Sequence, residues 1–432
     1  MIPSNQVTIQ LPGGPILVQN DGNLIRARGV RYAQADKRFE KPRAVSTWTE
    51  IQDCTKPASV CPQNTSRLAL VTGILEENNI QDEDCLHVSI YAPASAQAAP
   101  VMVFLHGGAY VTGGGDVDAY CPHGLASEGV VAVTVTHRLG IFGYLPIPNI
   151  APANLGLLDQ IEALKWIQGN IHAFGGDPAN VTLFGQSAGA DAIYCLLVAE
   201  GTSELFHRAI LQSLPLGRLH DKNRHHMTEA MSQCAANSLS AAHLQTGPVS
   251  SLLELQAKIQ KVARSVSSAL VTFAPLFNEY PLPPETSLFG RFISAVRQKP
   301  IFIGYTSNEE TAFKHIDSSE EATKYFYELF QGASNMLHRQ TAEALGYEPP
   351  IYEFHWYPEG NNNLLATHCM ELPFLLGNWS AWKDAPMLQG TDAQRVVETV
   401  GSAVKNLWIA FSRGADLTNR KFIIDENFRF VR

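Results

Sequence analysis

Residues 174–189 read FGGDPANVTLFGQSAG and decide the fold of this chain. Residues 181–184 (VTLF) are β-branched or apolar, which is the composition of a buried strand. The last five residues have the form G-x-S-x-G with Ser187 at the centre, and the run AGADAIYCLLVAE that follows Ser187 has helical spacing. We therefore expect Ser187 to stand on a sharp strand-to-helix turn at the carboxyl edge of a sheet. The helix behind it points backbone N–H groups at any charge that forms there.

Composition limits the class of protein. The chain has 432 residues, 45% of them hydrophobic and 17% charged, so it can bury a large core. Its net charge of −9 argues against nucleic acid or an anionic membrane surface as a partner. Residues 1–14 have no basic n-region and no apolar h-region of a secretory signal, which favours the cytoplasm, although a secreted mature form stays open.

Neither a membrane helix nor a metal site is expected. A membrane-spanning helix needs about 18 consecutive apolar residues, and no apolar run in the sequence comes close to that length. Seven cysteines are too few, and odd in number, for a disulfide scaffold. None of them stands in a C-x-x-C, and His225-His226 lacks partners at zinc-ligand spacing. We expect no metal and no organic cofactor.

Strand-like and helix-like segments alternate through the chain. Buried strands are expected over 101–110, 130–140, 208–214, 300–307 and 352–358, and helices over 157–171 and 392–413. This alternation predicts an α/β fold with a mainly parallel central sheet and helices on both faces. Without a linker or a shift in composition, residues 1–432 are expected to form a single domain. Cap-like excursions are expected at about 216–300 and 311–350.

An acid and a histidine follow later strands. A serine hydroxyl needs a base to take its proton and a third group to fix the base, and such groups gather at the carboxyl ends of parallel strands. Glu309 and Glu310 directly follow the strand 300–307, and His368 lies in a loop after the strand 352–358. The order serine, acid, histidine is that of the α/β-hydrolases. Either glutamate could equally be a solvated turn residue, and the histidine a surface residue.

A glycine-containing loop, where the apolar run 101–110 breaks at two glycines, supplies the remaining chemistry. Attack on a carbonyl creates an oxyanion, which needs hydrogen-bond donors already in place. The run His106-Gly107-Gly108-Ala109 stands after an apolar strand, in the manner of the oxyanion loop of esterases. We assign the donors to the N–H groups of Gly108, Ala109 and Ala188. The alternative for the two glycines is a plain turn.

The chain resembles the type-B carboxylesterase family, whose members are α/β-hydrolases. The resemblance rests on RGVRYA, EDCL, HGGAY, HRLGIFGYL and NLGLLDQIEALKWIQGNIHAFGGDPANVTLFGQSAG, and extends over nearly the whole length. It implies that Ser187 is the nucleophile and, through the segment THCMELPF, that His368 is the base. Aligning IGYTSNEETAF with the acid segment of the family places the triad carboxylate on Glu309 and not on Glu310.

The resemblance also implies structural pairs and shows departures. Cys61 and Cys85 match two cysteines that form a disulfide in the family, and Arg38 and Glu83 match a structural salt bridge. Gln186 stands where the family usually has a glutamate, which removes a negative charge beside the nucleophile. The segment 61–85 contains no tryptophan that could hold a quaternary ammonium group. These departures argue against a cholinesterase.

We therefore expect a serine carboxylic-ester hydrolase that acts through an acyl-enzyme on a small-to-medium apolar or aromatic ester. An acyltransferase, an amidase or a lactonase could use the same triad, and a non-catalytic adhesion or scaffold protein could share the fold. The expected partner is a small-molecule ester, with no nucleic acid and no membrane span. The expected assembly is a monomer or a homodimer.

Overall fold

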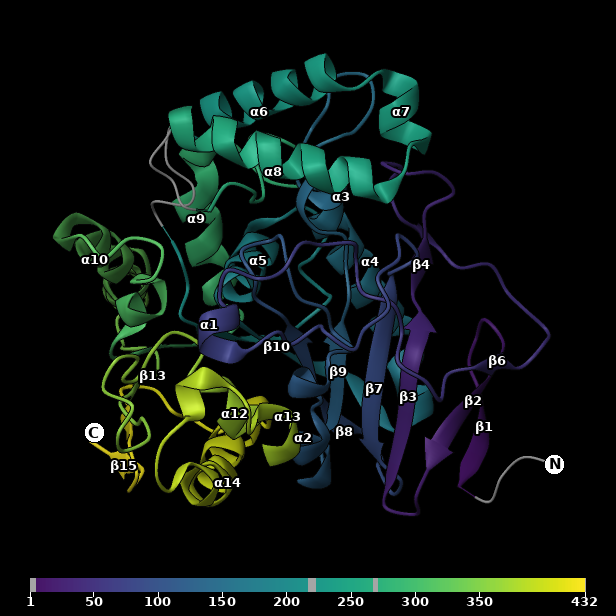
Figure 1. Cartoon of the computed structure of the whole chain (residues 1–432). Coiled ribbons are helices and arrows are strands. Elements are labelled where there is room, and N and C mark those ends of the chain that lie inside the picture. The colour runs from purple at the N-terminus through teal and green to yellow at the C-terminus, as the bar shows by residue number, and fades with distance from the viewer. Residues whose placement is uncertain (1–4, 217–222, 267–270, 432) are drawn as a thin grey trace.

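A single mixed sheet forms the centre of the computed structural model, which describes residues 5–216, 223–266 and 271–431 (Figure 1). Its strand order is β1-β2-β3-β7-β9-β8-β10-β11-β12-β13-β14-β15, and β6 pairs with β2 beside this path. The strands are β1 (Gln6–Gln10), β2 (Pro15–Asn20), β3 (Leu24–Arg31), β6 (Gln52–Asp53), β7 (His87–Pro93), β8 (Ala99–Leu105), β9 (Val131–Val135), β10 (Gly176–Gln186), β11 (Arg208–Gln212), β12 (Ile301–Thr306), β13 (Ile351–Phe354), β14 (Lys421–Ile424) and β15 (Arg429–Phe430). A separate hairpin joins β4 (Ala33–Gln34) to β5 (Arg43–Ala44).

The strands from β9 to β14 in this order pair in parallel. Leu183 of β10 stands opposite Val103 of β8 and Ala209 of β11, which fixes the register at the centre of the sheet. Every residue of β9 and β12 is buried, as strands covered on both faces require. The first strands, β1, β2 and β3, pair antiparallel at one edge.

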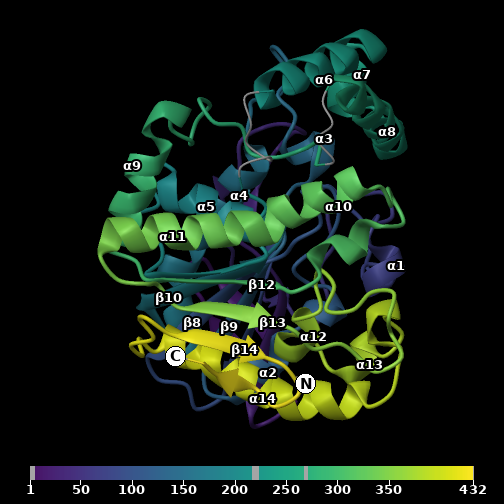
Figure 2. The same cartoon turned by 90° about the vertical axis from the view of Figure 1, so that its left-hand side faces the viewer.

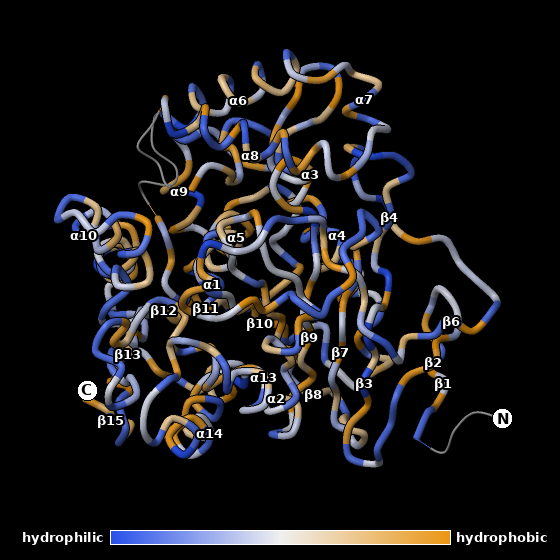
Figure 3. The backbone as a smooth tube through the Cα atoms, viewed as in Figure 1, coloured by the Kyte–Doolittle hydropathy of each residue, from blue (hydrophilic) through white to orange (hydrophobic). Residues whose placement is uncertain are grey.

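Helices cover both faces of the sheet (Figure 2). One face carries α4 (Leu155–Asn170), α5 (Ala188–Val198), α9 (Glu285–Val296) and α11 (Ala333–Leu345); the other carries α2 (His123–Ser127), α12 (Leu372–Leu375) and α14 (Ala393–Ser412). The buried apolar residues accordingly divide into two clusters, one on each face. Hydrophobic colouring follows the central strands in Figure 3. The α/β-hydrolase fold predicted from the sequence is confirmed.

The first predicted excursion is helical but ends earlier than expected. Helices α6 (Arg224–Ser238), α7 (Ala241–Thr246) and α8 (Val249–Val266) form a layer outside the α4–α5 face, at the top of Figure 1. Helix α9 instead packs on α5, where the rings of Tyr194 and Phe292 lie 5.1 Å apart. The cap therefore ends before α9, because the buried face of α9 belongs to the main core.

The second excursion is a helical arm beside the far strands. It comprises the 3-10 helix η3 (Glu309–Phe313), α10 (Glu320–Tyr327), the π-helical turn η4 (Glu328–Gly332) and α11. The other short α-helices are α1 (Ala69–Thr72), α3 (Gly140–Gly143) and α13 (Trp379–Trp382), and the other 3-10 helices are η1 (Asp118–Tyr120), η2 (Ile171–Phe174) and η5 (Pro386–Leu388). Within the described ranges, none of the helices combines the length and the apolar character that crossing a bilayer requires.

Candidate active site

Ser187 stands at the join between β10 and α5. Its backbone has φ 58° and ψ −124°, a conformation that non-glycine residues rarely adopt outside functional turns. The turn needs glycine on both sides. A Cβ at Gly189 would come within 1.9 Å of the Leu105 carbonyl oxygen, and one at Gly185 within 2.8 Å of the same oxygen. The Ser187 N–H donates to the carbonyl of Gln212 at 2.9 Å, which ties the turn to β11.

Glu309 and His368 form a fully buried pair. Nδ1 of His368 donates to Oε2 of Glu309, and Oε1 of Glu309 accepts the N–H of Thr306 at 2.9 Å. The two loops are held together because the N–H of Asn308 donates to the carbonyl of Ala366 at 3.0 Å. The structure thus brings Glu309 to the histidine, as the aligned segment predicts.

The neighbouring Glu310 does not contact His368. Its side chain is half-buried, and burial raises the pKa of its carboxyl above the ordinary value. Its backbone lies in the same 3-10 helix as Glu309, so a step of one residue separates the carboxylate that meets the imidazole from the one that does not.

Gln186 makes a contact that the sequence does not predict. With Nδ1 bonded to Glu309, Nε2 is the free acceptor of the His368 ring, and the side-chain nitrogen of Gln186 lies 3.1 Å from it. Ser187 and His368 line the same cavity, but no hydrogen bond joins them among the described residues. The amide therefore takes the position on the imidazole that a nucleophile's hydroxyl would need.

The glycine-containing loop lies directly against the nucleophile. A Cβ at Gly107 would stand 2.8 Å from the Gln186 carbonyl oxygen and 3.2 Å from Cβ of Ser187, so only glycine allows this approach. Gly108 has φ 109°, and a Cβ there would meet the Thr112 carbonyl oxygen at 2.1 Å.

The three predicted donors surround the cavity. Gly108, Ala109 and Ala188 all line it, and Ala109 keeps a left-handed φ of 54°. Within the described ranges, none of their N–H groups donates to another protein group. Free, fixed N–H groups beside a strained serine are the arrangement that stabilises an oxyanion.

The cavity at this site is narrow and mostly apolar. Its volume is about 50 Å³. The ring of Phe330 lies 4.3 Å from the His368 ring, and Phe313 stacks on Phe326 at 4.0 Å. These rings come from η3, α10 and η4. The lining residues are Ser66, Arg67, Leu68, Gly108, Ala109, Val111, Thr112, Ser187, Ala188, Pro215, Val271, Phe313, Phe326, Leu329, Phe330 and His368.

A second buried carboxyl lies behind the triad. Burial and the negative charge of Glu309 raise the pKa of Glu371 to about 8, so Glu371 is protonated at neutral pH. Gln212 Nε2 and Ser213 Oγ approach its carboxyl without reaching ordinary hydrogen-bond geometry, and all of these atoms are buried. In the sequence, Glu371 stands three positions after the predicted base, but no local pattern there indicates that it is buried.

Two buried histidines support the glycine-containing loop from behind. Nδ1 of His106 lies 2.8 Å from the Gly107 carbonyl oxygen, and the rings of His106 and His137 are 4.7 Å apart. Burial lowers the pKa of His106 to about 4 and that of His137 well below its usual value. Both are therefore neutral structural residues at neutral pH.

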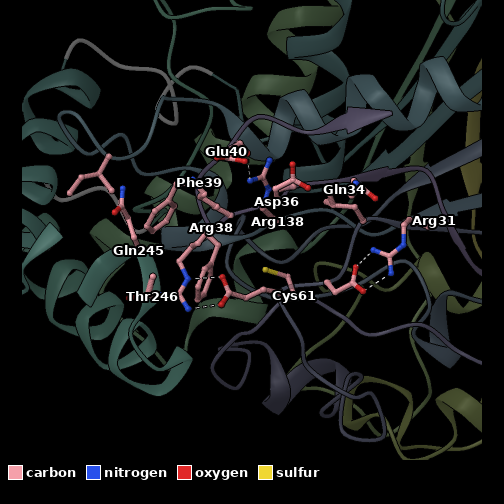
Figure 4. A pocket seen from close by; sticks show the side chains of 17 residues that line it. Arg31, Gln34, Asp36, Arg38, Phe39, Glu40, Cys61, Arg138, Gln245 and Thr246 are labelled. Atoms are coloured by element: carbon pink, nitrogen blue, oxygen red, sulfur yellow. Dashed lines mark hydrogen bonds and ion pairs between the residues drawn. The ribbon is translucent and has the colours of Figure 1, made fainter. Parts of the chain in front are cut away.

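A larger groove of about 1,060 Å³ lies away from Ser187 (Figure 4). Two ion pairs lie within its lining. Arg38 binds Glu83 through two contacts of 2.7 and 2.5 Å, which confirms the predicted salt bridge, and Arg31 binds Asp84. Residues 5–216, 223–266 and 271–431 include no cluster of three metal-ligating side chains. This groove is a weaker candidate than the smaller cavity, because four of its charged side chains are held in ion pairs with each other and Ser187 lies elsewhere.

Cys61 lies at the floor of this groove as a free thiol next to Cys85. A hydrogen bond to Cys61 and burial raise the pKa of the Cys85 thiol well above its usual value. The predicted pairing is therefore close in space but not oxidised here. The disulfide stays a prediction for oxidising conditions.

Known esterases and hydrolases resemble this chain in sequence. The sequence profile described as "Carboxylesterase family" matches residues 10–345. A "Probable N-octanoylanthranilate hydrolase" of Rhodococcus erythropolis is 32% identical over 428 residues, covering 94% of this chain and 92% of that protein. A para-nitrobenzyl esterase of Bacillus subtilis is 31% identical over 442 residues, covering 93% and 88%.

Solved structures agree with the sequence relatives. A p-nitrobenzyl esterase superposes with a TM-score of 0.83 at 26% identity, over 99% of this chain and 97% of that one. The profile match includes the Ser187 turn, and each of the two relatives aligns with more than nine tenths of the chain. The chain therefore belongs to the carboxylesterase family and is an enzyme that hydrolyses carboxylic esters.

Proposed function

We propose that Ser187, His368 and Glu309 are the catalytic triad of this esterase. Ser187 Oγ attacks the ester carbonyl carbon while His368 Nε2 takes the hydroxyl proton and passes it to the departing alcohol. Glu309 fixes the imidazole tautomer and stabilises the imidazolium. Water, activated by the same His368, then releases the acid from the acyl-enzyme. The observation that carries this proposal is the buried Glu309–His368 pair opening into the cavity that holds Ser187.

Proton transfer requires a change of partner on the histidine. The Gln186 amide nitrogen lies at Nε2 of His368, so the Ser187 hydroxyl must replace it when substrate enters. The oxyanion that follows would be held by the N–H groups of Gly108, Ala109 and Ala188.

The shape of the cavity favours small esters. A volume of about 50 Å³ is far below the roughly 300–1,000 Å³ of pockets for drug-sized ligands. Small acyl chains therefore fit the cavity as it stands, whereas medium apolar or aromatic groups require the phenylalanine side chains to move. Amide cleavage is the second candidate, because the name of the Rhodococcus relative specifies an N-acyl substrate.

Substitution of the triad tests this proposal. Ser187→Ala and Glu309→Gln should each lower kcat for p-nitrophenyl butyrate by about a thousandfold or more. Glu310→Gln is the matched control for the acid, and Ser402→Ala, on the exposed side of α14, is the control for the serine. Turnover that survives in Ser187→Ala, or a loss in Glu310→Gln as large as in Glu309→Gln, would contradict the assignment.

Hydrolysis and acyl transfer are separated by their products. Water is the acceptor we propose, so the free acid should remain the main product when a small alcohol competes. A dominant transesterified product would identify an acyltransferase instead.

We also propose that residues 1–432 form one domain, active as a monomer or a homodimer.

A further inference from the structure

Arg67 is the only residue with a permanent charge among the described residues that line the active-site cavity. It precedes α1, in a segment that the sequence shows only as a polar loop. The other lining residues, apart from His368, are apolar or carry hydroxyl or backbone groups. Arg67 is partly buried, and withdrawing a guanidinium from water is costly unless an anion compensates its charge.

No carboxylate pairs with Arg67 among the described residues. Its pKa is lowered, first by burial and then by the like charge of Arg264 on α8, and Tyr325 acts in the opposite direction. Over residues 5–216, 223–266 and 271–431, no carboxylate acts on this pKa. Three other arginines with mostly buried side chains behave differently, since Arg28, Arg38 and Arg138 each bind a carboxylate at 2.5 to 2.7 Å. Figure 4 shows Arg38 with its partner.

The acids near the triad leave this positive charge uncompensated. Glu309 is committed to His368, and Glu371 is protonated at neutral pH. Gln186, beside the nucleophile, is a neutral amide. The buried Glu76, in the same segment as Arg67, has a raised pKa because of burial and forms no ion pair within the described chain. The charges of the described residues around the cavity therefore favour an anion.

We infer that Arg67 binds a carboxylate of the substrate, so that the preferred substrates are esters whose acyl or alcohol part is anionic. The inference rests on the proposed esterase function and adds the substrate class. The guanidinium of Arg67 can donate two parallel hydrogen bonds to a carboxylate, and the negative charge of the carboxylate would compensate the positive charge of Arg67. Arg67 acts here as a specificity-determining residue and takes no part in proton transfer.

Two matched substrate pairs test the inference. On the alcohol side, p-carboxyphenyl butyrate is compared with p-carbamoylphenyl butyrate; on the acyl side, the p-nitrophenyl monoester of glutaric acid is compared with p-nitrophenyl pentanoate. The measured quantity is the ratio of kcat/KM for the anionic ester to that for the neutral ester. In at least one pair, Arg67→Gln should lower this ratio about tenfold or more, mainly through KM. Arg67→Lys should restore part of it.

The control is Arg339→Gln, the same chemical change on the exposed side of α11 and outside the cavity lining. A ratio that moves less than about threefold in both pairs, or moves equally in Arg339→Gln, overturns the inference. Inhibition of neutral-ester turnover by glutarate is a second measurement. The inhibition constant of glutarate should rise about tenfold in Arg67→Gln, because the inhibitor binds more weakly. If the folded parent enzyme cleaves none of the four esters, the proposed function fails, and this outcome is distinct from failure of the anion site.

Discussion

At the scale of single residues, Glu371 shows how burial sets protonation near the triad. A folded-state pKa of about 8, against an ordinary value of 4.5, means that the folded protein binds more protons than the unfolded chain between these pH values. Stability from this group is therefore complete below about pH 4.5 and is lost as pH rises toward about 8. The free energy of unfolding can fall through this group by at most about 1.4 kcal/mol per pH unit.

Glu371→Gln removes this titration while keeping the shape of the side chain. The free energy of unfolding of the parent should fall relative to that of the variant as pH rises through this window, measured by urea denaturation. Glu343→Gln, on the exposed side of α11, serves as the control and should follow the parent. Parallel pH profiles for parent and Glu371→Gln would show that the carboxyl is not kept protonated.

At the scale of elements, the arm formed by α10 and η4 shapes the cavity. The π-helical turn η4 places Leu329 and Phe330 at the cavity, and Phe326 reaches it from α10. Inserted π turns are frequent at functional sites because they redirect side chains within a helix. The arm therefore sets how long an acyl chain the triad can accept.

Phe326→Ala should widen the cavity and shift the preference from butyrate toward octanoate among p-nitrophenyl esters, read as a ratio of kcat/KM values. Phe326 is 2% exposed, so the same change should cost about 3–5 kcal/mol of stability. Phe289→Ala on α9, where the ring is 52% exposed, is the control and should change neither quantity appreciably. An unchanged chain-length ratio in a folded Phe326→Ala variant would show that Phe326 does not limit the pocket.

At the scale of the whole molecule, one sheet contains strands from β1 near the start of the chain to β15 near its end. The cluster on each face draws residues from segments far apart in sequence, so neither half has a core of its own. We expect the single domain that we propose to unfold in one cooperative transition, with calorimetric and van't Hoff enthalpies in agreement. Two resolved transitions, or non-coincident fluorescence and circular dichroism curves, would indicate separate folding units.

The sequence predicts the parallel strands and the Ser187 turn better than it predicts the side chains that surround the candidate site. Continuous apolar runs identify the parallel strands, and the motif around Ser187 identifies the turn, because both are local patterns. Which residues meet across the fold is not a local property. The contact of Gln186 with His368 and the burial of Glu371 therefore could not be predicted. The four-residue α1 is too short to show helical periodicity, so the place of Arg67 beside the cavity also stayed hidden.

The central claim is that Ser187 is the attacking nucleophile, and covalent labelling tests it most directly. Diethyl p-nitrophenyl phosphate transfers its diethylphosphoryl group to an activated serine with release of p-nitrophenolate, and peptide mapping by mass spectrometry locates the group. Esterase activity should fall in proportion to the fraction of Ser187 that carries the label. Loss of activity with the label on another residue, or full activity with Ser187 labelled, would contradict the account.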